Sequence, residues 1–587
     1  MATPFKIHYA KTSPLTLKPL EESFVPTEEE FRYQYNPFRI GDVQNYNPTY
    51  SEFFVMNEKN YGRIAFNNKY HIKDIDTVVN HESKTEHKRP IFIKYSPLLD
   101  PLRFMIGKYD LTDAKTRTLP NLENETLPKL SSYHNTSYVD NFFCYLNSQL
   151  LNHHAAPNCM DYYGSFLGIQ ERFKMNLVDD LEYVSSSTFF KENLGKRFVV
   201  NHESHHDYKN FGSRGHKLKL QIESDVLEID AICLEDEVLA DQETQENCNS
   251  FSSRNPIIEK GKELECPEGA GGGELVYENA KVEGGRDDSS SSASSNSSNN
   301  SEINYSSSDE DEDEDDCSSG SEWETESSGN AECSQDEDYI AAYINDFPVQ
   351  MICLEKCDGT LDELFMKNEI NEENGSAVMM QIIMTLLLFQ KCFRFTHNDL
   401  HTNNVMYVNT DLDFLYYKFE NQIYKVPTFG KIFKIIDFGR AIYKFQGRTF
   451  CSDSFAPGGD AATQYNCEPF FNDKKARLEP NFSFDLSRLG TSIYDFVVND
   501  DENENLDEFQ KTIKRWCTDD NGKNILYKKN GEDRYPNFKL YKMISRTVHE
   551  HTPENQLKFK YFSQYRLKSR VDVSTQVLDI DSIPTYI

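Results

Sequence analysis

The pattern of apolar and polar residues predicts strands and helices in an interleaved order. In residues 137–153 the apolar side chains recur at spacings of three and four, the period of one helix face. Residues 90–95 instead form a compact apolar run between two prolines, which is typical of a strand. By the same criteria we expect short strands within 53–75 and strands at 161–167, 349–354, 404–408 and 431–436. We expect a short helix at 359–365, a long apolar helix at 377–394, and a mostly helical chain from 485 to about 570.

Three other stretches have a weaker or different pattern. The tyrosine-rich residues 415–419 and 423–426 predict an additional hairpin between two of the strands. Residues 1–50 mix Pro, Tyr and acidic residues with little period, so we expect an extension that wraps a domain surface. Residues 171–234 contain periodic pieces such as 217–222, and we expect this part of an insertion to be partly ordered.

Composition adds a long polar segment to this picture. Residues 235–338 consist mainly of Ser, Asn, Gly and acidic residues, which cannot bury enough apolar surface to offset chain entropy, so we expect a disordered insertion. Residues 302–338 alone contain 16 Asp and Glu and no Lys or Arg, close to half of the net charge of −34. Serines beside these acids are candidate phosphorylation sites, but a solvating linker is the interpretation we favour.

Charge and apolar content also bound the function. An acidic chain disfavours binding to a phosphate backbone, so we expect no nucleic-acid partner. The apolar run 378–389 is too short to span a bilayer and residues 1–6 lack an apolar signal core, so we expect no membrane association and no secretion. The 13 cysteines include no C-x-x-C pair, which indicates reduced thiols in a cytoplasmic protein.

The candidate chemistry lies at 397–404 and 437–439. Asp399 and Asn404 stand in the spacing H-x-D-x-x-x-x-N, and Asp437 begins D-F-G after an apolar strand. Phosphoryl transfer uses one carboxylate beside the attacking hydroxyl, and an amide and a second carboxylate to hold Mg²⁺ on the nucleotide phosphates. Each residue alone is also typical of a turn, but together they favour Asp399 as catalytic base and Asn404 and Asp437 as magnesium ligands, with ATP as phosphate donor.

The order of these elements and motifs resembles the eukaryotic-type protein kinase fold. Residues 396–401, 436–441 and 457–460 are similar to kinase-like proteins of large nucleocytoplasmic DNA viruses. The resemblance covers about 50–170 and 340–570, and implies an α+β fold with a small antiparallel β lobe and a mainly helical large lobe. The implied domains are an N-terminal extension (1–50), the first part of the small lobe (51–170), an insertion (171–234 and 235–338), the end of the small lobe with the hinge (339–358), and the large lobe with a C-terminal tail (359–587).

The resemblance assigns further residues to the nucleotide site. Lys94 matches the strand lysine that contacts the α- and β-phosphates, with an exposed strand lysine as the alternative. Its usual partner is a glutamate on the next helix, and 138–150 contains none. Asp140 is our preferred substitute, Gln149 is a second, and Asp140 as an ordinary acid of the first helical turn stays open.

Backbone groups and supporting side chains complete the implied site. Residues 355–357 match the hinge that binds adenine through backbone groups, so Glu355 and Cys357 are candidate contacts and Leu354 would be the gatekeeper. Asp485, in 484–490, matches an aspartate that braces the catalytic loop. Two other residues of the motifs, His397 and Gly439, are expected to support the site structurally.

Three departures from the family pattern leave alternatives open. Neither Gly41 nor Gly62 lies in a G-x-G-x-x-G loop. Kinases that act on Ser/Thr usually have Lys where His401 stands, and no A-P-E motif follows, Glu479 and Pro480 being at best a remnant. We therefore predict an ATP- and Mg²⁺-dependent serine/threonine protein kinase acting on a protein hydroxyl, with a pseudokinase scaffold or a small-molecule kinase as alternatives. If the chain is viral, it is expected in the host cytoplasm or the virion.

Overall fold

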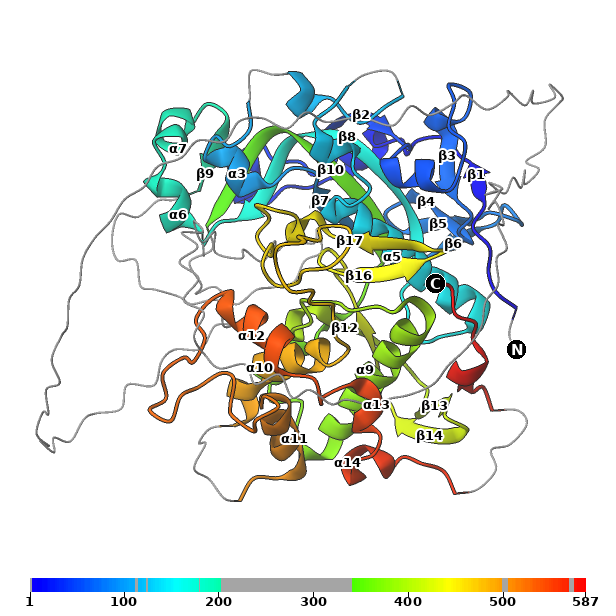
Figure 1. The fold of residues 1–587 in the computed structure, drawn as a ribbon. Helices are drawn as coiled ribbons and strands as arrows, with labels where there is room; N and C mark the ends of the chain where they lie inside the picture. Colours follow the sequence, from blue (N-terminus) through cyan, green and yellow to red (C-terminus); the bar gives the residue numbers. More distant parts are fainter. Residues whose placement is uncertain are drawn as a thin grey trace, which may run out of the picture. The chain divides into compact units, whose positions relative to one another are not determined.

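The computed structural model describes residues 3–110, 114–122, 125–178, 180–201, 340–498, 505–568 and 575–587. Within these ranges helices alternate with several antiparallel sheets, which confirms the predicted mixed α+β class (Figure 1). The insertion predicted to be disordered, 235–338, and the periodic piece at 217–222 both lie outside the described residues.

The largest sheet has five strands in the order β2-β8-β10-β7, and β9 pairs with the outer part of β10. Every pairing in this sheet is antiparallel. In β7 alternate residues such as Ile91 and Ile93 are buried, as the apolar pattern predicts, and the predicted strands at 90–95, 161–167 and 349–354 are confirmed. The strands are β2 (Ile40–Gln44), β7 (Ile91–Pro97), β8 (Tyr162–Asn176), β9 (Phe198–Val200) and β10 (Ala341–Glu355).

Two features of this sheet differ from the sequence expectation. Strands β8 and β10 are 15 residues long, and β8 continues past residue 171, where the insertion was predicted to begin. The end of β8 pairs with the start of β10, beginning with Asn176 opposite Ala341. Buried side chains such as Phe173 give this paired part of the two strands an apolar face. Strand β2 comes from the first 50 residues, so that segment adds a strand to the sheet as well as covering other elements.

Short elements precede and flank the sheet. Strands β1 and β3 pair with each other, and β4, β5 and β6 form a three-stranded sheet, which confirms short strands within 53–75. Two helices, α6 and α7, lie in the described start of the predicted insertion. The bounds are β1 (Tyr9–Lys11), β3 (Ile64–Phe66), β4 (Tyr70–Asp74), β5 (Thr77–Asn80), β6 (Glu86–Lys88), α1 (Lys18–Ser23), α2 (Glu28–Arg32), α3 (Pro101–Met105), α4 (Pro128–Ser131), α6 (Leu181–Ser186) and α7 (Thr188–Asn193).

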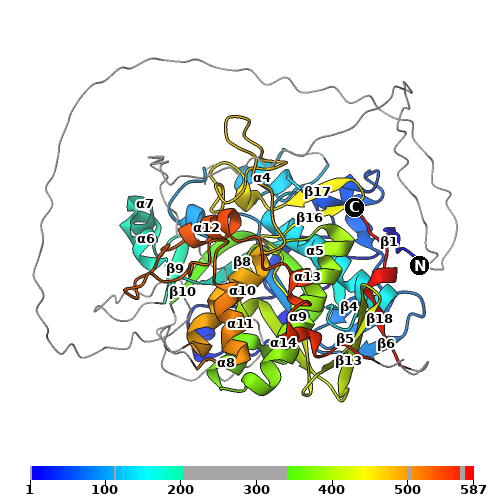
Figure 2. The same ribbon diagram turned by 60° about the horizontal axis from the view of Figure 1, so that its bottom comes forward.

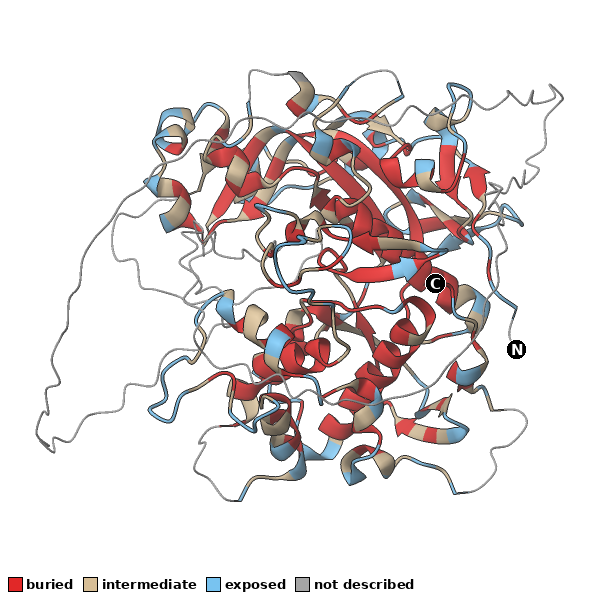
Figure 3. Ribbon diagram, in the orientation of Figure 1, coloured by how far each residue is buried: buried red, intermediate tan, exposed pale blue. Residues whose placement is uncertain are grey.

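Helix α5 (Thr136–His154) confirms the helix predicted at 137–153. It begins at the N-cap Asn135, whose side chain accepts a hydrogen bond from the Ser137 N–H. The helix contacts β8 and β10 of the large sheet. Aromatic side chains on the helix also meet rings from the later part of the chain, since the Phe143 and Phe438 rings lie 4.6 Å apart. Residues 137–150 of the helix are all buried (Figure 3). Packing on every face of this stretch fixes the rotation of α5 about its axis.

The later part of the chain combines helices with short strands, and its longest described helix is α9 (Glu372–Phe393). This helix is long and apolar enough to cross a membrane, but 94% of its most apolar window is buried inside the protein, so it is a core helix. The chain from 485 to about 570 is less helical than predicted, because residues 517–538 form turns and isolated bridges rich in Asn, Asp and Gly. The helices are α8 (Leu361–Met366), α10 (Phe484–Val497), α11 (Glu508–Trp516), α12 (Lys539–Thr547), α13 (Pro553–Gln556) and α14 (Lys560–Ser563).

Small sheets carry the two sequence motifs. Strands β11, β12 and β15 form one sheet, and the predicted additional hairpin is present as β13 and β14, with β18 alongside. A second hairpin, β16 and β17, follows the D-F-G motif. The bounds are β11 (Gly359–Thr360), β12 (Val405–Asn409), β13 (Phe414–Phe419), β14 (Gln422–Pro427), β15 (Lys431–Ile435), β16 (Ile442–Phe445), β17 (Arg448–Cys451) and β18 (Leu578–Asp579).

The two ends of the described chain lie close together in both views (Figures 1 and 2). The Phe5 and Tyr586 rings stack with centroids 4.2 Å apart. The Tyr586 hydroxyl also accepts a hydrogen bond from the Phe5 N–H, at 3.3 Å, and lies 2.7 Å from Nε2 of His154 at the end of α5. The ends of the chain therefore help to hold α5 in place.

Candidate functional site

The antiparallel pairing of β12 and β15 brings the two motifs together. Val405 is opposite Ile435, and the next N–H, from Ile436, donates to the Asn404 carbonyl at 3.0 Å. Asn404 and Asp437 consequently stand at the same end of this ladder. Asp437 has φ of 59°, in the left-handed region, so the chain turns sharply there.

Lys94 points into this site from the large sheet. Its Nζ lies 2.8 Å from Asp140 Oδ2 and 2.9 Å from Asp437 Oδ1. The Lys94 side chain is 13% exposed and that of Asp140 only 1%, so this is a largely buried ion-pair group. The other oxygen of Asp140 accepts a hydrogen bond from the Phe438 N–H at 2.9 Å. Of the two helix residues considered from the sequence, Asp140 is therefore the one at Lys94, whereas Gln149 is buried elsewhere with its Oε1 unpaired among the described residues.

These charges shift the pKa values of the three groups in different directions. Burial raises the pKa of Asp140 above its ordinary value, and the attraction of Lys94 offsets this only in part. Burial acts in the same direction on Asp437, but the charge and hydrogen bond of Lys94 outweigh it and lower the pKa of that carboxyl. Burial alone would lower the pKa of Lys94, but the two carboxylates raise it. The amine therefore stays protonated at neutral pH, which is the form that attracts phosphate.

The carboxylate of Asp399 is held by cationic and phenolic side chains. Its Oδ1 accepts a hydrogen bond from the Tyr541 hydroxyl at 2.7 Å, and its Oδ2 lies 3.3 Å from Arg440 Nη1. Arg488 is 3.9 Å from Oδ1, and Arg440 also binds Asp460 at 2.7 Å. Sequence reasoning did not assign a role to these partners, although Arg440 directly follows the D-F-G motif.

Cationic neighbours keep Asp399 ionised. Burial alone would raise its pKa, but the charges of Arg440 and Arg488 and the Tyr541 hydrogen bond lower it below the ordinary value. An ionised carboxylate can orient a hydroxyl and accept its proton. The same partners occupy both of its oxygens, so an incoming hydroxyl would share or replace one of these hydrogen bonds.

The backbone around Asp399 is braced from helix α10. Asp485, fully buried, accepts hydrogen bonds from the N–H groups of His397 and Asn398 at distances from 2.9 to 3.1 Å. The His397 ring binds the Ile436 carbonyl at 2.8 Å, which ties this loop to the strand before Asp437. The resemblance assigned Asp485 and His397 to structural support, and these contacts are of that kind.

The side chain of Asn404 has a defined orientation. Its Nδ2 donates to the Asp399 carbonyl at 2.9 Å and lies 2.9 Å from His401 Nε2. The amide oxygen is thereby directed away from both groups. His401, noted in the sequence only as a departure from the usual lysine, contacts a predicted metal ligand.

Two oxygens of this site could serve as ligands of a magnesium ion. Among the described residues, we find no hydrogen-bond donor to Asn404 Oδ1 or to Asp437 Oδ2, and Asp437 is 34% exposed. Magnesium needs only one or two protein oxygens when phosphates and waters supply the rest. The described ranges contain no cluster of three or more His, Cys, Asp or Glu side chains arranged for a metal, so a metal held by these two side chains would take its other ligands from phosphate and water.

The predicted hinge follows β10. Leu354 is buried, and Glu355 uses its N–H in a hydrogen bond to the Asp161 carbonyl. The Glu355 carboxylate binds the buried Lys434 at 2.8 Å, an ion pair that sequence reasoning missed although Lys434 lies inside an apolar strand. Cys357 is buried, and its backbone N–H has no hydrogen-bond acceptor within the part of the chain that the structure describes. The other two predicted hinge N–H groups, of Glu355 and Lys356, donate to the Asp161 and Pro90 carbonyls.

The glycines considered for a phosphate loop lie away from Lys94. Gly41 is in β2, which is separated from β7 by two strands, and Gly62 is in a short 3₁₀ helix, Tyr61–Arg63. Gly439 lies against the first turn of α5, where an added Cβ would come within 3.1 Å of the Thr136 methyl group. A glycine is therefore favoured at this third position of D-F-G.

Comparison with known proteins gives no family assignment. No protein-family model matches the chain, and no curated protein matches it. The function is therefore inferred from the residues of the site and their geometry.

Proposed function

We propose that this protein transfers the γ-phosphoryl group of ATP to a hydroxyl group, as a serine/threonine protein kinase. The observation that carries the proposal is the contact of Lys94 with Asp437, because these residues are separated by most of the chain and were selected from the sequence for the same phosphate site. Asp399 and Asn404 join them through the pairing of β12 with β15 and through the Asn404 amide.

Each residue has a distinct role in this proposal. Lys94 binds phosphate oxygens and neutralises part of their charge. Asp437 and Asn404 would hold Mg²⁺, which when bound neutralises charge on the nucleotide phosphates. Asp399 orients the acceptor hydroxyl and takes its proton, while Arg440 and Tyr541 hold that carboxylate in place.

A protein kinase-like fold is part of the same proposal. The sheet that carries Lys94, with α5 and Asp140, would form the small lobe, and the helices around α9 would form the large lobe. The proposed domain limits are those expected from the sequence, with residues 355–357 as the hinge and the Cys357 N–H as a donor to adenine. A relationship to kinase-like proteins of large DNA viruses, and action in a host cytoplasm or virion, belong to this proposal as well.

A second candidate is a nucleotide-binding scaffold without catalysis. It is favoured by the full occupation of Asp399, whose two oxygens are bound by Tyr541 and Arg440. A small molecule as the phosphate acceptor is a third candidate. Glu479, the remnant of the A-P-E motif, binds Arg477 at the surface at 2.6 Å instead of closing a peptide-binding segment.

Transfer of labelled phosphate from ATP and Mg²⁺ to the chain itself or to generic protein substrates tests the proposal. The Asp399→Asn variant is expected to lose about 10²-fold or more in rate while keeping its fold. Asp411→Asn, an exposed acid between β12 and β13, is the matched control and should retain the rate of the unaltered protein. Equal rates in Asp399→Asn and the unaltered protein would reject the catalytic assignment. Binding of Mg·ATP without any transfer would support the scaffold.

A further inference from the structure

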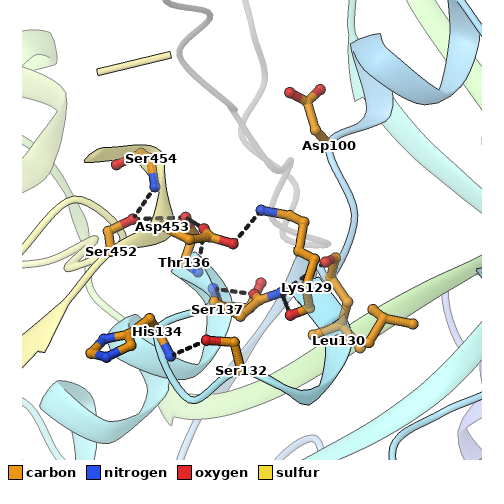
Figure 4. A network of polar contacts seen from close by, with 12 residues as sticks. Asp100, Lys129, Leu130, Ser132, His134, Thr136, Ser137, Ser452, Asp453 and Ser454 are labelled. Carbon is orange, nitrogen blue, oxygen red and sulfur yellow. Dashed lines mark hydrogen bonds and ion pairs between the residues drawn. The ribbon is translucent and has the colours of Figure 1, made fainter. Parts of the chain in front are cut away.

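A polar network joins the start of α5 to the chain that follows the D-F-G motif (Figure 4). Asp453, just after β17, directs its carboxylate between Lys129 and Thr136. Its Oδ2 lies 2.6 Å from Lys129 Nζ, and its Oδ1 accepts from the Thr136 N–H at 3.1 Å and from the Thr136 hydroxyl at 2.9 Å. The Asp453 side chain is 14% exposed. This one carboxylate thus satisfies three donors.

The position of Asp453 suits a negative charge. The first N–H groups of a helix have no acceptor within the helix, and the aligned peptide dipoles make that end positive. Thr136 is the first residue of the 19-residue α5, so the Asp453 carboxylate binds at the positive end of a long helix. Lys129 adds a full positive charge on the other side, and its pKa is raised because Asp453 outweighs the effect of burial.

Neighbouring contacts bind the same two segments together. The Asp453 N–H donates to the His134 carbonyl at 2.7 Å, and the His134 ring lies 3.1 Å from the Cys451 carbonyl. The Ser452 and Thr136 hydroxyls are 2.8 Å apart. The start of α5 is therefore fixed to the segment after β17 by both backbone and side-chain bonds.

The helix transmits this fixation to the phosphate site. Asp140 follows Thr136 by one helical turn, so both residues lie on the same face of α5. Asp140 contacts Lys94 and the Phe438 N–H, and Thr136 lies against Gly439. A shift or rotation of the first turn of α5 would consequently move Asp140 relative to Lys94.

We infer that Asp453 is a positioning residue: its carboxylate holds the start of α5 against the segment after β17 and so keeps Asp140 at Lys94. The inference deepens the proposed function, on which its catalytic consequence rests. The contact with Lys94 is a property of the folded protein and can be measured without any reaction.

The test measures the acylation rate of Lys94 by an amine-reactive reagent, by mass spectrometry of the full chain, together with kcat for phosphate transfer. In Asp453→Ala, Lys94 should be acylated about tenfold faster, because the amine loses its contact with Asp140 and opens more often to the reagent. Lys434, buried and paired with Glu355, is the internal reference and should not change. The rate kcat should fall by roughly 10-fold to 100-fold, as for a misplaced site residue. Asp453→Glu, which restores a carboxylate, should recover both readouts in large part.

Asp507→Ala is the matched control variant. Asp507 caps α11, where its side chain accepts from the Gln510 N–H at 2.8 Å, so its loss weakens a helix start that is not bound to Lys94 or Asp140. Unchanged Lys94 acylation in Asp453→Ala, or an equal increase in Asp507→Ala, would overturn the inference. If Asp453→Ala does not fold, Thr136→Val decides, because it removes only the hydroxyl bonds and should give a smaller increase in the same direction. If the unaltered protein transfers no phosphate, the proposed function fails, while the acylation of Lys94 still decides the positioning role.

Discussion

Replacing Lys94 by methionine tests whether the buried ion-pair group exists as described. Methionine has a similar length and no charge, so the substitution removes the cation and keeps most of the packing. Asp140 and Asp437 would then face each other without the amine that now lies within 2.9 Å of an oxygen from each. We expect Lys94→Met to be strongly destabilised at neutral pH.

The magnitude follows from the geometry and burial. Two carboxylates about 5 Å apart repel each other by about 3 kcal/mol at an effective dielectric constant of about 20. Removing one partner of a buried ion pair costs about 3 to 5 kcal/mol in measured cases. The expected loss in the free energy of unfolding is therefore about 3 kcal/mol, since Asp437 is partly open to solvent. Adding Asp140→Asn, which keeps an acceptor for the Phe438 N–H, should restore about 2 kcal/mol of this loss.

Urea denaturation followed by circular dichroism measures these differences. Lys88→Met is the matched control: Lys88 lies 2.7 Å from Asp76, but both side chains are more than half exposed, so the midpoint should change little. The deficit of Lys94→Met should also shrink as the pH is lowered, because protonation of a carboxyl then removes the repulsion. A Lys94→Met variant within about 0.5 kcal/mol of the unaltered protein would refute the reasoning, as would a deficit that Asp140→Asn deepens.

Three further predictions concern stability. Asp485→Asn should lower the free energy of unfolding by about 2 kcal/mol, because a buried carboxylate that accepts from two backbone N–H groups is replaced by an amide. An unchanged urea midpoint would contradict the bracing role. Burial lowers the pKa of His71 from 6.5 to about 3, so the unfolded state binds a proton first and the folded protein loses stability as the pH drops below 6.5. Between about pH 8 and pH 5, His71→Gln should remove about 1 to 2 kcal/mol of this loss in the free energy of unfolding. The same dependence of stability on pH in His71→Gln and in the unaltered protein would contradict this prediction. Tyr586→Phe should lower the free energy of unfolding by about 1 kcal/mol, because the hydroxyl contacts with the Phe5 N–H and the His154 ring are lost. An unchanged thermal midpoint would show that the ends of the chain do not stabilise α5.

The elements that the sequence predicted well are those whose pattern is set locally. Helix α5 has apolar side chains at spacings of three and four, and the two tyrosine-rich strands β13 and β14 follow each other directly along the chain; both elements are present. The outer half of β8 was not predicted, because its pairing partner lies beyond the insertion, at Ala341 and after. Strand β2 was missed for a similar reason: its five residues are ordered by pairing with β8 and not by an apolar pattern of their own.

The same distinction applies to the candidate site. Lys94, Asp399, Asn404 and Asp437 stand in recognisable spacings, and the fold brings them into one region. Their supporting partners come from distant segments without a motif. Tyr541, for example, is separated from Asp399 by 142 residues, and nothing in the sequence around it indicates this contact.

The magnesium dependence of phosphate transfer decides whether Asp437 and its neighbours form a phosphate-transfer site. Labelled phosphate incorporated from ATP is measured over a range of Mg²⁺ concentrations for the unaltered chain and for Asp437→Asn. The account predicts transfer that requires Mg²⁺ and falls by about 10²-fold or more in Asp437→Asn, with the urea midpoint of that variant showing that it is folded. Transfer at the original rate by folded Asp437→Asn, or no transfer by the unaltered protein at any Mg²⁺ concentration, would contradict it.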